Sequence, residues 1–107
     1  MLLTVNERFV LLEILPREGS FATLKIVRKL RESLSFTEQE LKDFDIKESL
    51  LPDGRVSIQW DNTKVKDAPI AIGEKATDII VGALKKLDQD GKLTDREYSL
   101  YGKFIGE

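Results

Sequence analysis

The alternation of apolar and charged positions is clearest between Ser20 and Leu34, and it predicts an amphipathic helix there. At 100° per residue, one side is apolar and consists of Ile26, Val27, Leu30 and Leu34, with Leu24 at its margin. The other side is charged and consists of Lys25, Arg28, Lys29 and Glu32. Ser20 is a good N-cap for this helix, because its hydroxyl can accept a hydrogen bond from the first turn.

Three T-x-x-E motifs predict the starts of three more helices, because Thr and Glu in this spacing cap each other's backbone N–H groups. They are Thr4 with Glu7, Thr37 with Glu40, and Thr94 with Glu97. The first helix is expected to run to about Leu15, just before Pro16. It is apolar on most sides, which indicates that it is largely buried or covered by a partner.

The second of these helices is short and is expected to end near Phe44. A long helix is expected from Glu74 to about Gln89, followed by Gly91 as its C′ residue. Its apolar face consists of Ala76, Ile79, Ile80, Ala83, Leu84 and Leu87. The last helix is expected to turn Tyr98, Tyr101, Phe104 and Ile105 inward, and to leave Leu100 outside this face.

Strict alternation of Val56, Ile58 and Trp60 predicts a β-strand with these residues facing the core. The preceding Pro52-Asp53-Gly54 is a turn, so the segment is interpreted as a β-hairpin. A third short strand is expected at residues 70–72, with Pro69 at its start or edge.

These elements define an α+β protein in which helices pack against a small antiparallel β-hairpin or three-stranded sheet. The expected order is α-α-α-β-β-(β)-α-α. The 107 residues suit a single domain spanning 1–107 with one hydrophobic core.

The composition excludes several common kinds of catalytic and metal-binding site. The chain has no Cys and no His, so it lacks the usual nucleophile–base pairs and zinc ligands. No catalytic, cofactor or metal residue is assigned, and a non-enzymatic role is expected. With no cysteine, no apolar run long enough to span a membrane and no signal peptide, a cytoplasmic location without membrane contact is expected.

The segment Asp88–Glu97 matches the second half of an EF-hand calcium loop. However, Lys86 stands at the first ligand position, where a carboxylate is required. A helical hairpin accounts for the same residues, because Gly91 ends one helix and the Thr94 capping box starts the next. No metal is therefore expected here.

The basic side of the 20–34 helix is the candidate interaction site, formed by Lys25, Arg28 and Lys29 with Arg31 at its edge. Two helices followed by a hairpin are somewhat like a winged helix, which would use these cations on phosphates. Against this, residues 36–62 carry seven Asp/Glu and three Lys/Arg, and these carboxylates repel nucleic acid.

Most of the chain is covered by three features in a fixed order. They are the segment LPREGS-x-x-TLKIVRKLRESLSFTEQEL, a lone Trp, and the segment ALKKLDQDGKLTDREYSLYGKF. In this order the chain resembles small uncharacterised proteins encoded by phages and prophages. The resemblance implies a phage or mobile-element origin, a binding role and, in that case, a location in the host cytoplasm. It implies no catalytic residue.

The expected function is a non-enzymatic protein-interaction module, which binds a protein partner or a second copy of itself. The excess of apolar positions in the first helix motivates this expectation. The alternative is a winged-helix-like nucleic-acid-binding regulator.

Overall fold

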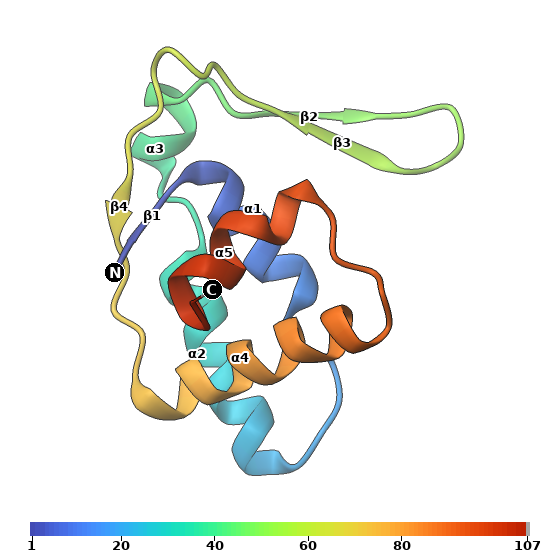
Figure 1. The fold of residues 1–107 in the computed structure, drawn as a ribbon. Coiled ribbons are helices and arrows are strands. Elements are labelled where there is room, and N and C mark those ends of the chain that lie inside the picture. The colour runs from blue at the N-terminus through green and yellow to red at the C-terminus, as the bar shows by residue number, and fades with distance from the viewer. Residues whose placement is uncertain (107) are drawn as a thin grey trace. The chain divides into compact units, whose positions relative to one another are not determined.

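The computed structural model describes residues 1–106 and confirms the α+β class. The elements are β1 (Leu2–Leu3), α1 (Val5–Ile14), α2 (Phe21–Leu34), α3 (Glu38–Asp43), β2 (Lys47–Leu50), β3 (Val56–Gln59), β4 (Ala68–Pro69), α4 (Glu74–Gln89) and α5 (Asp95–Phe104) (Figure 1). The chain forms two compact units. Residues 1–35 and the residues from 68 onward form a helical unit, and residues 36–67 form a hairpin unit. The expectation of a single domain over 1–107 stays a prediction.

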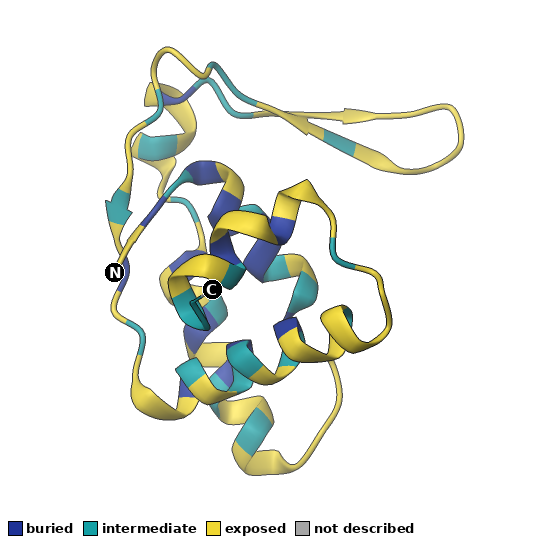
Figure 2. Cartoon of the chain, in the orientation of Figure 1, coloured by how far each residue is buried: buried dark blue, intermediate teal, exposed yellow. Residues whose placement is uncertain are grey.

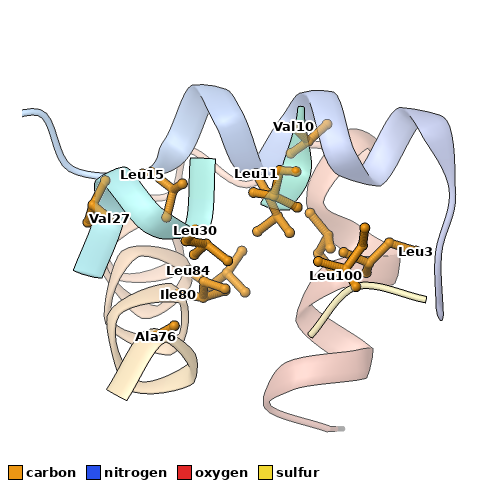
Figure 3. Packing of buried hydrophobic residues seen from close by; sticks show 12 residues of the cluster. Leu3, Val10, Leu11, Leu15, Val27, Leu30, Ala76, Ile80, Leu84 and Leu100 are labelled. Carbon is orange, nitrogen blue, oxygen red and sulfur yellow. The ribbon is translucent and has the colours of Figure 1, made fainter. Parts of the chain in front are cut away.

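The core of the helical unit lies between α1, α2, α4 and α5. Figure 3 shows side chains of α1, α2 and α4 gathering around Leu30 and Leu84, while Leu3 and Leu100 meet beside Val10. The cluster consists of Leu3, Val10, Leu11, Leu15, Val27, Leu30, Leu34, Ile70, Ala76, Ile80, Leu84 and Leu100. Full burial of one such leucine contributes ~1.5–3 kcal/mol. The expected burial of the first helix is confirmed.

The expected helix starts are also confirmed. All three capping boxes are formed, and Ser20 Oγ accepts a hydrogen bond from the Thr23 N–H at 3.2 Å. Gly91 follows α4 with φ 65°, a left-handed conformation that glycine adopts at little cost. The helical hairpin between α4 and α5 is therefore confirmed.

The inward face of α5 differs from the expected one. Leu100 is fully buried, whereas Tyr98 is 71% exposed, so both assignments were wrong. The two residues lie about 200° apart on the helix, so only one can face the core. The aliphatic Leu100 fills the core and Tyr98 keeps its hydroxyl in water. Tyr101, Phe104 and Ile105 pack partly buried against the core, as expected.

The third strand is also corrected. It consists of Ala68–Pro69 rather than residues 70–72, and it pairs with β1 instead of with the hairpin. The register is antiparallel, with Leu3 opposite Ala68. Beyond it, the Ile70 N–H donates to the Met1 carbonyl at 2.9 Å. Two-residue strands are too short to show an alternating pattern, so this pairing could not be predicted from the periodicity of apolar residues.

Arg8 is buried on α1, which the pattern of apolar positions does not predict. Its Nε donates to the Leu34 carbonyl at 3.1 Å, and its Nη2 donates to the Ser35 carbonyl at 2.8 Å. The last carbonyls of a helix have no partner within the helix. The guanidinium supplies donors for them and places a positive charge at the negative end of the helix dipole. Arg8 thus caps the C-terminus of α2 from α1.

The hairpin unit contains α3 and the hairpin of β2 and β3. The Asp61 N–H donates to the carbonyl of the buried Phe44 at 3.0 Å, which joins the end of α3 to the segment after β3. The strands pair antiparallel, with Leu50 opposite Val56, and the turn lies at Pro52-Asp53-Gly54 as expected.

The burial expected for the hairpin was wrong. Val56 is 58% and Ile58 37% exposed, and Trp60 is only partly buried. Figure 2 shows exposed residues along both strands. The physical reason is that the sheet has two strands, and no further strand of the described chain pairs with it. Alternation identified the side that a neighbour would cover, but no residue within the unit covers it.

We expect Arg8→Leu to lower the free energy of unfolding by roughly 2–4 kcal/mol, because the buried Leu34 carbonyl and the partly buried Ser35 carbonyl lose a charged donor. Denaturant melts followed by circular dichroism measure this. Arg8→Lys keeps the charge but loses the forked geometry, so it should fall between wild type and Arg8→Leu. An Arg8→Leu protein as stable as wild type would show that the cap on α2 contributes nothing.

Candidate interaction site

The structure divides the predicted basic residues into separate groups on α2. Arg28 and Arg31 lie with Arg17 around an open depression of about 410 Å³, which Leu24 also lines. Lys29 lines a different depression, and Lys25 lines neither. None of these five cations forms an ion pair with another described residue.

The basic face of α2, formed by Lys25, Arg28, Lys29 and Arg31, also carries exposed apolar side chains. Phe21 is 84% exposed and lies one turn before Lys25. Leu24 is also exposed, so two apolar side chains lie among the cations. A purely phosphate-binding face has no need of them, whereas a mixed face suits an amphipathic protein segment. The sequence indicates this exposed apolar surface, because Phe21 falls outside the apolar side of the predicted helix.

The winged-helix alternative requires that the helix after α2 binds in a groove of a nucleic-acid duplex. Here that helix is α3, which has six residues and is therefore about 9 Å long. Its residues include Glu38, Glu40 and Asp43, with Lys42 as the single cation. This composition opposes contact with phosphates.

A second exposed surface lies on one side of the hairpin. Side chains in a strand alternate between two sides, and the register places Leu50 opposite Val56 and Glu48 opposite Ile58 on the same side. Leu50 is 78% exposed, which makes this side apolar and uncovered. We call the surface formed by Leu50, Val56 and Ile58 the hairpin face. The other side is polar and consists of Lys47, Ser49, Ser57 and Gln59.

The base of the hairpin is hollowed. A depression of about 310 Å³ is lined by Ile58, Gln59, Trp60 and Asn62. The indole Nε1–H of Trp60 donates to the Asn62 side-chain oxygen at 2.8 Å, which holds the ring in place. A residue of the hairpin face, Ile58, therefore also lines a hollow beside a fixed aromatic ring.

The only carboxylates that are buried, Glu7 and Glu97, are both engaged in the described structure. Glu7 accepts hydrogen bonds from Lys103 Nζ at 2.6 Å, Ser99 Oγ at 2.9 Å and the Thr4 N–H at 2.9 Å. Burial acts most strongly on the pKa of Glu7 and raises it, but these hydrogen bonds together lower it below its usual value. A carboxylate with a lowered pKa is a weak base at neutral pH, so this cluster joins α1 to α5 rather than preparing a reaction.

The helical unit has no dominant cavity. Three open depressions have similar volumes of about 550, 570 and 580 Å³. One of them contains Tyr101, whose hydroxyl donates to Asp88 at 3.3 Å; partial burial first and then this carboxylate raise the pKa of Tyr101. Ligand sites are usually a single large pocket with converging polar groups. The described residues do not single out such a pocket.

Residues 1–106 contain neither a cluster of potential metal ligands nor a helix suited to cross a membrane. No group of three or more Asp and Glu side chains lies close enough together to hold a metal ion. No helix in this range combines the length and apolar character needed to cross a bilayer.

Comparison with protein-family models, curated proteins and solved structures finds no match to this chain. The assignment of a site therefore rests on the geometry of the hairpin face and of the basic face.

We expect Glu7→Gln to reduce stability at pH 7 and to flatten its dependence on pH. The pKa of Glu7 is lower in the folded chain, so the ionised carboxylate stabilises the fold above the unfolded pKa. This stabilisation is lost as pH falls through the folded pKa. Denaturant melts from about pH 2 to 7 should show a smaller acid-side loss in Glu7→Gln. Equal slopes for both proteins would refute a lowered pKa.

We also expect no duplex DNA binding tighter than ~10⁻⁶–10⁻⁴ M at physiological salt. Anisotropy titrations at several salt concentrations measure this. Phosphate contacts from three or four of these cations would give a log–log salt slope of roughly −3 to −4. The test variant is Arg28→Glu with Arg31→Glu, and the control is Lys85→Glu with Lys92→Glu. Sub-micromolar binding that only the first variant abolishes would favour the nucleic-acid alternative.

Proposed function

We propose that this chain is a non-enzymatic protein-interaction module that binds a protein partner through the hairpin face. The observation that carries this proposal is the exposure of Leu50, Val56 and Ile58 on one side of a two-stranded sheet. Two-stranded hairpins alone are marginal in water, and they need a further strand or a packed apolar face. A partner that covers this side supplies what the unit lacks.

The energetics support an apolar contact. Full burial of a Leu, Val or Ile side chain contributes ~1.5–3 kcal/mol. Leu50 is 78% exposed and so retains most of this contribution for a partner. The polar side of the same strands offers no comparable gain. A partner surface is therefore expected to be apolar where it meets Leu50 and Val56.

The charge of the hairpin unit favours protein over nucleic acid. Residues 36–67 carry eight Asp/Glu and five Lys/Arg, a net charge of −3. This charge surrounds the hairpin face along the sequence, with Asp45 and Glu48 before it and Asp61 after it. These carboxylates repel the phosphates of a nucleic acid, whereas an apolar protein contact does not depend on phosphate binding.

A nucleic-acid-binding regulator is the second candidate, and one observation favours it. Arg17, Arg28 and Arg31 gather around one depression without a carboxylate partner among the described residues. The acidic α3 speaks against it. A phage or mobile-element origin and a cytoplasmic location belong to the same proposal and rest on sequence alone.

Photo-crosslinking tests the proposal. A photoreactive amino acid at position 50 is expected to form adducts with a protein, either in the purified chain or in the native cell. The same amino acid at position 49, on the polar side of the same strand, is expected to form few. No adduct from position 50 in either setting would contradict the proposed function.

The captured partner is then purified and titrated against matched double variants. Leu50→Glu with Val56→Lys replaces two of the three apolar residues of the hairpin face by a cross-strand ion pair, which is expected to keep the hairpin paired. We expect at least about tenfold weaker binding, equivalent to ~1.4 kcal/mol. Lys47→Gln with Ser49→Lys changes the polar side of β2 without changing the net charge and should bind like wild type.

A further inference from the structure

Both strands of the hairpin are edge strands, since the sheet contains only β2 and β3. The Leu51 N–H donates to the Arg55 carbonyl at 2.8 Å. In an antiparallel pair, successive residues direct their backbone N–H and C=O groups alternately toward the paired strand and away from it, so this bond determines which residues face outward. On β3, the backbone of Ser57 therefore faces β2, and the backbones of Val56 and Ile58 face outward. On β2, the outward groups are those of Glu48 and Leu50.

The two edge strands differ in how strongly their side chains oppose pairing with a further strand. Charged side chains on an edge strand oppose association with another strand. β2 carries Lys47 and Glu48, whereas β3 consists of Val-Ser-Ile-Gln and carries no charge. An uncharged edge with outward N–H and C=O groups is a template for a further strand. β3 is therefore the open edge of this sheet.

We propose that the partner at this edge is a second copy of the chain, whose β3 pairs antiparallel with β3 about a two-fold axis at Ser57. This inference rests on the proposed function and adds a second copy at the edge of the same sheet, where pairing joins the hairpin faces of two copies into one apolar surface. Val56 of each copy would lie opposite Ile58 of the other, and these outward groups would exchange four hydrogen bonds. The result is a four-stranded sheet, which satisfies the requirement for more than two strands.

The position of the axis follows from the side-chain pattern. With the axis at Ser57, the hairpin faces of both copies lie on the same side of the sheet. A shift by one residue would place apolar side chains opposite polar ones. Pairing through β2 is less favourable, because an axis at Ser49 places Glu48 against Leu50, and an axis at Glu48 places two carboxylates together.

The absence of cysteine in the sequence allows a direct test. At the axis, Ser57 would face its own copy as a non-hydrogen-bonded pair, with Cα atoms ~4.5 Å apart. This distance permits a disulfide. We expect Ser57→Cys to form a disulfide-linked dimer under mild oxidation at least about tenfold faster than Ser49→Cys, the matched position on β2. Equal rates, or faster linkage from Ser49→Cys, would overturn the proposed edge.

Sedimentation equilibrium of the intact chain provides the second measurement, over roughly 1 µM to 1 mM. Val56→Pro removes an outward N–H of β3, and Glu48→Pro removes an outward N–H of β2. We expect association of wild type, and a dissociation constant at least about tenfold higher in Val56→Pro than in Glu48→Pro. Circular dichroism verifies that both variants fold.

The outcomes separate this inference from the proposed function. A chain that is monomeric throughout, but whose position 50 crosslinks to another protein, refutes the second copy and keeps the interaction module. A dimer that Val56→Pro leaves intact, and that Leu50→Glu with Val56→Lys dissociates, refutes edge pairing and assigns the contact to the hairpin face. A monomer without any adduct refutes both.

Discussion

The buried guanidinium of Arg8 fixes the point at which the chain leaves the helical unit. It binds the carbonyls of Leu34 and Ser35, the residues at which α2 ends. The chain returns at Ala68, which pairs with Leu3 of β1. Both boundaries of the hairpin unit are thus held by the first eight residues. The N-terminal segment therefore contacts the helical unit at both points where residues 36–67 leave and rejoin it.

Local signals in the sequence predicted most elements, because capping and helical periodicity are short-range. The boxes at Thr4, Thr37 and Thr94 determine helix starts through residues three positions apart. The burial of Arg8 was not predictable in this way, since its partners lie 26 and 27 residues away. The inward turn of Leu100 depends in the same way on the packing of four helices.

The candidate site was predicted in part. The sequence identified the cations of α2, but only packing shows that Arg28 and Arg31 join Arg17 around one depression. It also identified the apolar side of β3, and assigned it to the core because alternation does not reveal whether a covering layer exists. The consecutive polar residues Lys47, Glu48 and Ser49 in β2 were the sign in the sequence that only part of the sheet carries apolar side chains.

The hairpin unit is, in its connectivity, an insertion into the helical unit. Its two ends meet a framework in which Arg8 binds the carbonyls of Leu34 and Ser35 and Leu3 pairs with Ala68. Changing the length of such a segment costs little, since each doubling of a loop adds only ~0.6 kcal/mol of closure entropy. Residues 36–67 can therefore differ in sequence and size at little cost to the packing of α1, α2, α4 and α5. If the proposed function holds, a replaced insertion would carry a different interaction surface on the same helical scaffold.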